Sequence, residues 1–502
     1  MTPAQPLSGV SSFFVCRSFW LPEVAMTRMR MSDAALNPDL VIDELIDALG
    51  VDQVRTGDDV HGRSAGIWRS DTIKAKALLR PATTQEVSRV LAICYKHGQS
   101  VVAHGGLTGL VESALTEPDD IVLSLERMNQ IDNIDPVNRT MSVQAGAILQ
   151  TVQEAADEHG LMFPLDIGGR GSATIGGNIS TNAGGNRVIR FGMIRDMVLG
   201  LEAVLADGTI VTSMNEMIKN NAGYDLKQLF IGTEGSLGIV TRAVLRLREK
   251  PLEQATVFVA VDDFDKLGLL LKKMDAGLGG ALSAFEVMWN NFYTQVTTPP
   301  AMSTPPISQA HPYYVLIEAM GADASVLERT LTEVWEADLV CDAVLAQTEA
   351  QRLQLWALRD DVEQCLRKTP WFIFDVSLPI QHMQGYVDQV NAGLQAEFET
   401  YKNFTFGHMG DGNLHFVVAV ETDDRTSYTD AVKTPDGVRH RVEACVYGPL
   451  KAINGSVSAE HGVGLEKKPW LHISRSPNEL KLMAMLKTAL DPKGILNPGK
   501  VF

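Results

Sequence analysis

The sequence feature that most constrains the fold is the glycine-rich run between residues 166 and 186, DIGGRGSATIGGNISTNAGGN. Three Gly-Gly pairs stand in it among small hydroxyl and amide side chains. Glycine has no Cβ atom, so such a backbone can approach another group closely. A packed apolar core does not need this composition, whereas a backbone pressed against a large polar ligand does. The run therefore predicts a binding site for a large polar ligand.

Two further glycine segments support this prediction. The first, HGGLTG at residues 104–109, follows a short β-branched stretch at 99–103, and the second is GTEGSLGIV at 232–240. A glycine loop after a strand can hold a pyrophosphate through its backbone amides, although an ordinary tight turn explains one such loop equally well. The G-x-G-x-x-G spacing of a nicotinamide site is absent where a βαβ unit would require it, which disfavours a Rossmann domain.

Composition excludes several classes of protein. With 502 residues, 45% of them hydrophobic and 21% charged, the chain is long enough for two or three globular domains. Its net charge of −17 repels nucleic acid and anionic membranes. The five cysteines form no C-x-x-C pair, so neither a disulfide framework nor an iron–sulfur cluster is expected. No apolar run is long enough to span a bilayer, and we expect a reducing, cytoplasmic location.

Residues 1–35 form a separate segment. Arg17, Arg28 and Arg30 outweigh Glu23, a balance also found in transit and signal segments. Methionines at 26, 29 and 31 offer alternative starts just before the first expected helix. We therefore expect a disordered leader at 1–35.

Capping and turn signals divide the rest of the chain into two regions. Before about residue 250, Asn37 and Pro38 precede an expected helix at 39–49, and Thr83 begins one that ends at residue 97. Beyond residue 250, longer strands and helices alternate, which predicts an α+β second domain. The strands expected there are 256–261, 313–319, 371–376, 404–407 and 414–420, and the helices are 265–273, one from about 325, one carrying Trp356, 381–398 and 439–453. A proline-rich stretch at 297–312 is expected to be an exposed loop.

Histidines frame the turn of the hairpin expected at 403–420. If Gly410–Asn413 turn the chain tightly, His408 and His415 come to lie side by side. Further on, the segment SVSAEHGVG at 456–464 supplies Glu460 and another histidine, His461. Two histidines and a carboxylate form a recognised divalent-metal arrangement. The alternative is that each histidine is a turn or core residue with satisfied hydrogen bonds, but the set as a whole favours a metal.

These motifs, with the LNPGK sequence at 496–500, resemble the FAD-dependent D-2-hydroxyacid dehydrogenases of the vanillyl-alcohol oxidase superfamily, whose members act on D-lactate, D-2-hydroxyglutarate and glycolate. The resemblance runs from about residue 70 to the end. It implies an α+β fold, with a two-subdomain FAD-binding domain of vanillyl-alcohol oxidase type at 36–250. A carboxy-terminal substrate domain with an antiparallel sheet is implied at 251–490, and a tail at 491–502 returns to the FAD domain.

The resemblance also implies roles for individual residues. His408, His415 and Glu460 correspond to a divalent-metal site, usually zinc, while His461 corresponds to the general base. Arg359 corresponds to the arginine that grips the substrate carboxylate, and Asn413 is placed with the catalytic residues. The cofactor-binding residues implied are Gly105, Gly106, Thr108, Gly109, Gly176, Gly177, Asn178, Thr181, Asn182, Gly184, Gly185, Gly235, Ile239 and Asn497. Leu107 occupies the place of a histidine found in covalently flavinylated relatives, so we expect non-covalent FAD.

Departures from the family pattern concern the substrate. The 2-hydroxyglutarate enzymes carry a threonine and a lysine where this chain has Glu363 and Ile373 or Phe374, so a second carboxylate should be repelled here. Lactate-like or larger apolar 2-hydroxyacids are expected at least as readily, unless an arginine such as Arg367 compensates. An ion pair between Arg359 and Glu363 is the alternative role for that arginine. Glu112 is expected to face solvent.

Three other functions remain open at this stage. The chain could be a zinc hydrolase, an oxidase that uses molecular oxygen, or a non-catalytic flavoprotein subunit of a larger complex. For a dehydrogenase, the family implies electron-transfer flavoprotein or a quinone as electron acceptor. A homodimer would be ordinary.

Overall fold

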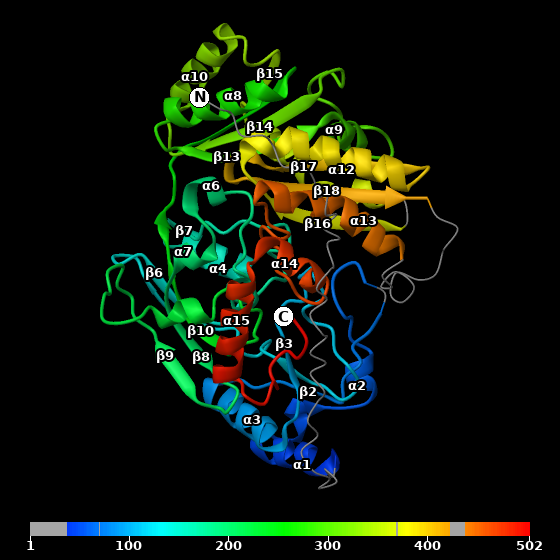
Figure 1. Ribbon diagram of the computed structural model, residues 1–502. Coiled ribbons are helices and arrows are strands. Elements are labelled where there is room, and N and C mark those ends of the chain that lie inside the picture. The colour runs from blue at the N-terminus through cyan, green and yellow to red at the C-terminus, as the bar shows by residue number, and fades with distance from the viewer. Residues whose placement is uncertain (1–37, 70, 368–369, 422–436) are drawn as a thin grey trace, which may run out of the picture.

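The computed structural model describes residues 38–69, 71–367, 370–421 and 437–502. The expected leader at 1–35 and the expected N-cap Asn37 lie outside these residues. Within the described ranges, no helix has the length and apolar character needed to cross a membrane. Figure 1 shows two halves, the later one above and the glycine-rich one below.

The glycine-rich half contains a mixed sheet and an antiparallel one. The mixed sheet has the order β1 (Val54–Arg55), β2 (Ala77–Leu79), β4 (Ile121–Ser124) and β3 (Val101–His104), and its last three strands are parallel. The antiparallel sheet has the order β5 (Ile131–Asp135), β6 (Thr140–Gln144), β10 (Ile239–Arg246), β8 (Val198–Val204) and β9 (Ile210–Ser213). A separate pair joins β7 (Leu161–Met162) to β11 (Arg248–Glu249). The helices are α1 (Pro38–Leu49), α2 (Asp58–His61), α3 (Thr84–His97), α4 (Leu149–Asp157), α5 (Ile175–Thr181), α6 (Val188–Phe191) and α7 (Ile194–Met197).

The later half is built on one large antiparallel sheet. Its seven strands run in the order β15 (Asp342–Leu345), β12 (Gln254–Val261), β14 (Tyr313–Met320), β13 (Leu282–Trp289), β17 (Tyr401–His408), β18 (Asn413–Val420) and β16 (Trp371–Ser377). The helices of this half and the carboxy-terminal helices are α8 (Phe264–Gly277), α9 (Asn290–Thr297), α10 (Ala324–Glu336), α11 (Glu349–Asp360), α12 (Met383–Glu397), α13 (Val438–Tyr447), α14 (Leu471–Ser474) and α15 (Pro477–Leu490).

Local signals account for the clearest helix boundaries. The Thr83 hydroxyl accepts the Glu86 N–H, while the Glu86 carboxylate accepts the N–H of Ala82, so each satisfies a donor at the start of α3. Gly98 ends that helix in the left-handed conformation, with φ of +65°. The helices expected at 39–49 and 83–97 are confirmed, as are the strands expected after residue 250. Strands β13 and β15 of the later half were not among the expected strands.

Four apolar clusters form the core of the described residues. One lies in the glycine-rich half and includes Ile495 and Leu496 from the end of the chain. Two more lie on opposite faces of the large sheet, and a small fourth cluster lies in the glycine-rich half. The carboxy-terminal tail extends the mixed sheet, because the Val101 N–H donates to the Ile495 carbonyl at 2.8 Å and the Asn497 N–H donates to the Val101 carbonyl at 2.8 Å. In Figure 1 the red tail accordingly reaches β3.

Candidate functional site

The predicted hairpin at 403–420 is confirmed and brings two histidines together. Strands β17 and β18 are antiparallel, with Phe406 opposite His415. A short 3-10 turn follows β17, and Gly412 adopts φ of +87°, a conformation that glycine tolerates without steric cost. The rings of His408 and His415 therefore lie with their centroids 5.2 Å apart.

Neighbouring strands place a carboxylate beside each histidine. On β13, Glu286 is paired in register with His408, and on β16, Asp375 is paired with His415. The Glu286 side chain is 1% exposed, lies 2.8 Å from Nδ1 of His408 and accepts from Nε of Arg359 at 2.8 Å. Sequence reasoning missed Glu286; the only local signal is a single acidic residue in the otherwise uncharged run of β13.

Arg359 does not form the ion pair with Glu363 that the sequence left open. Its guanidinium binds Glu286, so that alternative is wrong. Glu363 instead accepts from the indole N–H of Trp68 at 3.3 Å, from the other half of the chain. Arg359 is 5% exposed and lines the cavity described below, where it can meet a substrate carboxylate.

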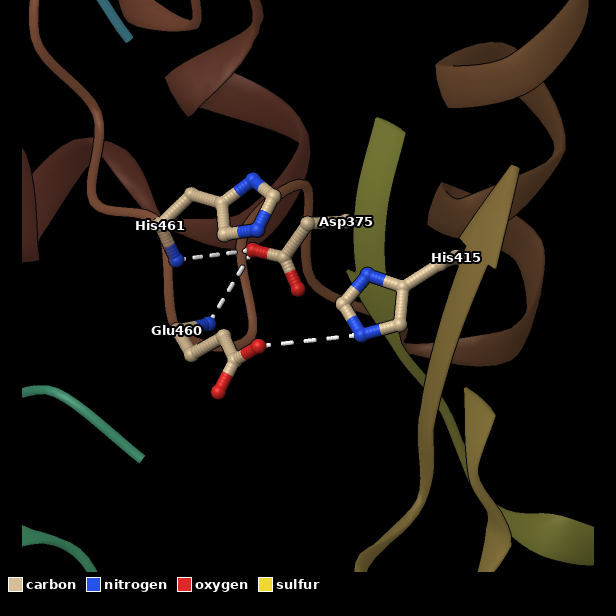
Figure 2. Close-up of side chains that lie close together, drawn as sticks. All are labelled: Asp375, His415, Glu460 and His461. Carbon is tan, nitrogen blue, oxygen red and sulfur yellow. Dashed lines mark hydrogen bonds and ion pairs between the residues drawn. The ribbon is translucent and has the colours of Figure 1, made fainter. Parts of the chain in front are cut away.

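Glu460 and His461 complete the cluster. Oε1 of Glu460 lies 3.6 Å from Nε2 of His415 and 3.8 Å from Nε2 of His408. Its Oε2 accepts the Gly185 N–H at 2.7 Å, from the glycine-rich run. The His461 ring lies with its centroid 5.6 Å from that of His415 and its plane tilted by 27°. Figure 2 shows both residues beside Glu460 and Asp375. The three expected metal ligands and the expected base thus meet in one place.

The carboxylate of Asp375 also lies close to Glu460, His415 and His461. One potential ligand atom from each of the four lies within 4.8 Å of the others (Figure 2). However, Oδ2 of Asp375 accepts three backbone N–H groups and the Lys467 ammonium, and its Oδ1 accepts the Asn413 amide at 2.9 Å. Because these donors engage both oxygens, Asp375 is better suited to orient the site than to bind a metal. Asn413, predicted as catalytic, is not among the residues that line the cavity, and its side-chain amide donates to Asp375.

The titrating groups of the site are strongly perturbed. Burial alone would lower the pKa of His408, but the charge and hydrogen bond of Glu286 raise it to about 10. Burial and the positive charge of His408 hold the pKa of His415 well below its usual range. Burial also lowers the pKa of His461. Glu460 stays ionised, since hydrogen bonding and charge from His408 outweigh its burial and bring its pKa to about 2.

A cavity of about 620 Å³ runs from this cluster to the glycine loops. Among the predicted cofactor residues, only Asn182 is not part of its lining; it caps α5 with φ of +53°, and its side chain accepts the Arg195 N–H. The lining residues predicted from the sequence are Gly105, Gly106, Thr108, Gly109, Gly176, Gly177, Asn178, Thr181, Gly184, Gly185, Gly235, Ile239, Asn497, Arg359, His408, His415, Glu460 and His461.

The cavity offers donors that suit a dinucleotide. The buried Nδ2 of Asn178 has no hydrogen-bond partner. Within the described part of the chain, no acceptor is bound to the backbone amides of residues 105–109. Unpaired buried donors are costly unless a ligand satisfies them, and clustered backbone amides are a common way to bind phosphate. The residues present therefore fit a pyrophosphate-bearing cofactor.

Glu112 corrects one expectation. Its side chain was expected to face solvent, but it is 8% exposed and accepts from the Arg69 guanidinium at 3.2 Å. Glu112 is covered through a tertiary contact, because Arg69 comes from a distant loop that lines the same cavity.

Comparison with known proteins identifies FAD as the cofactor of the matching families. Residues 75–213 match the family described as FAD binding domain, and residues 250–501 match the family described as FAD linked oxidases, C-terminal domain. The chain is 40% identical over 432 residues to a mitochondrial D-2-hydroxyglutarate dehydrogenase of Bos taurus, covering 85% of this chain and 77% of that one. It is 38% identical to a D-2-hydroxyglutarate dehydrogenase of Xanthomonas citri pv. viticola, covering 85% and 89%, and 37% identical to a putative mitochondrial D-lactate dehydrogenase of Schizosaccharomyces pombe, covering 85% and 82%.

Solved structures agree on the fold. A substrate-bound p-cresol methylhydroxylase superposes with a TM-score of 0.72 at 17% identity, over 92% of this chain and 96% of that one. An alkyldihydroxyacetonephosphate synthase superposes with a TM-score of 0.69 at 15% identity, over 92% and 84%. At these identities the likeness concerns the fold alone.

Together, the fold, the cavity and the two family matches define an FAD-linked oxidoreductase whose fold is of the vanillyl-alcohol oxidase type. More particularly, the chain belongs to the family of FAD-dependent D-2-hydroxyacid dehydrogenases that its relatives represent. Some of these relatives are named as mitochondrial, so the expected cytoplasmic location stays a prediction.

Proposed function

We propose that this protein oxidises a D-2-hydroxyacid to the 2-oxoacid, with non-covalently bound FAD, a divalent metal at His408, His415 and Glu460, and His461 as general base. The observation that carries the proposal is the position of this cluster and Arg359 at one cavity that the glycine loops also line. Zinc is the metal we expect, because two imidazoles and one carboxylate with open positions suit it.

The two bound groups supply different chemistry. When bound, FAD would supply the acceptor for the hydride from C2 of the substrate. A metal held by His408, His415 and Glu460 would lower the pKa of the substrate hydroxyl, as a metal does for bound water.

The chain's own residues position the substrate and accept its proton. Arg359, held by Glu286, is placed to bind the substrate carboxylate and so to fix which hydrogen on C2 faces the cofactor. The ring nitrogens of His461 have no hydrogen-bond partner among the described residues, and burial favours its neutral form. A neutral imidazole in this position can take the hydroxyl proton.

The cavity wall favours substrates with an uncharged side chain. Trp68, Trp371, Ile373 and Glu363 all line it. Apart from Arg359, which is assigned to the 2-hydroxyacid carboxylate, the arginines that line it are already bound to carboxylates: Arg69 to Asp71 and Glu112, and Arg439 to Glu443 and Glu466. A second substrate carboxylate would have to compete with these acids. D-lactate or a larger apolar D-2-hydroxyacid is therefore our first choice.

D-2-hydroxyglutarate is the second candidate, because several relatives are named for it. Electron-transfer flavoprotein or a quinone remains the acceptor we propose, since the cysteines offer no iron–sulfur site. Oxidation by molecular oxygen, a non-catalytic role and a homodimer stay open alternatives. A zinc hydrolase is disfavoured because it would leave the FAD-binding half without a role.

The experiment follows the visible absorbance of the FAD-loaded protein without oxygen while D-lactate, D-2-hydroxyglutarate and a bulky apolar D-2-hydroxyacid are added in turn. Each L-enantiomer is the control. We expect an uncharged D-acid to bleach the flavin fastest. Bleaching by D-2-hydroxyglutarate alone would contradict the substrate choice, and no bleaching by any acid would support the non-catalytic subunit.

A further inference from the structure

Residues 459–464, here called the bridging segment, carry both Glu460 and His461. Five backbone N–H groups of the segment donate to only two side chains, both buried carboxylates. Ala459, Glu460 and His461 donate to Asp375 at 3.0, 3.0 and 2.9 Å, and Val463 and Gly464 donate to Glu234 at 2.6 and 2.9 Å. Figure 2 shows the Asp375 side of this arrangement at Glu460 and His461.

The two carboxylates belong to different halves of the protein. Asp375 lies on β16 in the large sheet. Glu234 lies in the GTEGSLG segment of the FAD-binding half and lines the cavity. The bridging segment is therefore fixed at its start by one half and at its end by the other.

Close contact with the FAD-binding half explains why the bridging segment has glycine at positions 462 and 464. Gly462 has φ of +90°, and a Cβ atom there would lie 2.8 Å from Oε1 of Glu234. Gly464 has φ of +53°, and its Cβ atom would lie 1.9 Å from the Val111 carbonyl. Any other residue at these positions would push the segment away from the FAD-binding half.

Glu234 is itself held by the FAD-binding residues. Its backbone N–H donates to the Ser180 carbonyl at 2.7 Å, and its backbone carbonyl accepts the Asn497 amide. Its carboxylate also accepts the Ser113 hydroxyl. Burying a carboxylate is costly, but only a carboxylate offers two acceptor oxygens, one for each of the Val463 and Gly464 N–H groups.

We propose that Glu234 is a positioning residue of the active site. It holds the bridging segment from the FAD-binding half, so that Glu460 and His461 keep their places opposite His408 and His415. The catalytic part of this inference rests on the proposed function, whereas the structural part does not.

The test compares Glu234→Gln with the wild type. Glutamine keeps one acceptor oxygen but presents an amide donor to the second backbone N–H, so the segment should loosen. Hydrogen exchange of the peptide that covers residues 459–464, measured without FAD or metal, should accelerate about tenfold or more. In the FAD- and zinc-loaded protein, the rate of flavin reduction by the best D-acid should fall about tenfold while KM changes less than about threefold.

Glu318→Gln is the matched control. Glu318 is a fully buried carboxylate that also joins the halves, through Arg187, but it does not touch the bridging segment. It should leave exchange at 459–464 unchanged. Equal acceleration by both variants would show general loosening between the halves and overturn the proposal.

Two further outcomes are decisive. Unchanged exchange in Glu234→Gln overturns the positioning role whatever the activity, whereas a wild type that no acid reduces defeats the proposed function and leaves the exchange result valid. If Glu234→Gln does not fold, Ser113→Ala removes one donor to the same carboxylate and should accelerate exchange in the same segment to a smaller degree. No change there overturns the proposal.

Discussion

A carboxylate oxygen of Glu286 lies 2.8 Å from Nδ1 of His408, across the pairing of β13 and β17. The other ring nitrogen of His408, Nε2, lies 3.8 Å from Oε1 of Glu460 and 3.4 Å from Nη2 of Arg359. A carboxylate behind a metal-binding histidine fixes its tautomer and orientation. The same carboxylate also binds Arg359, so one buried side chain contacts both the proposed metal site and the proposed substrate site.

We predict that Glu286→Gln weakens both functions. Zinc affinity should fall about 10- to 100-fold, the usual effect of losing such a partner, and KM for the D-acid should rise because Arg359 loses its anchor. Competition with a chelating dye measures the affinity. Glu318→Gln, a buried carboxylate on the neighbouring strand β14, is the control. If both variants bind zinc as the wild type does, Glu286 has no role at the metal.

Arg359→Lys should raise KM about tenfold or more while FAD still binds. Lysine keeps the charge but loses the planar fork that binds a carboxylate through two parallel hydrogen bonds. Arg352→Lys on the same helix is the matched control, because Arg352 is also paired with carboxylates, Glu349 and Glu318, but does not line the cavity. Steady-state kinetics with both variants make the comparison. Similar KM values would remove Arg359 from substrate binding.

The pH dependence should report His461. Burial lowers its pKa below the ordinary histidine value of about 6.5. The base acts when neutral, so the rate of flavin reduction should be level above that value and fall as pH decreases below it. Stopped-flow absorbance from pH 5 to 9 measures the rate of flavin reduction. In His461→Ala the decrease of this rate at low pH should be absent. A wild-type rate that still rises between pH 8 and 9 would point to another base.

Ile373→Lys should shift the substrate preference toward D-2-hydroxyglutarate. The substitution adds a cation to a cavity wall where Glu363 supplies negative charge, so a second carboxylate gains a partner. We expect kcat/KM for D-2-hydroxyglutarate to rise relative to D-lactate. Ile373→Gln, polar but uncharged, is the control. If lysine and glutamine have the same effect, charge at this wall does not set the preference.

Local sequence patterns were sufficient to predict those parts of the structure that depend on residues close together along the chain. The hairpin that joins His408 and His415 follows from the glycine turn between them, and the glycine loops line the cavity as expected. The contacts that could not be predicted join distant residues. Glu286 lies 122 residues before His408, and Glu234 lies 229 residues before Val463. Glu112 was misplaced for the same reason, because no local pattern shows that Arg69 covers it.

Metal removal tests the proposed metal-assisted mechanism most directly. The FAD-loaded protein is treated with a chelator, freed of it, and mixed without oxygen with the D-acid that bleaches the untreated flavin, before and after Zn²⁺ is added back. We predict that the metal-free protein keeps its flavin spectrum, that reduction slows about 100-fold or more, and that Zn²⁺ restores it. Undiminished bleaching by protein shown to contain no metal would contradict the metal-assisted mechanism.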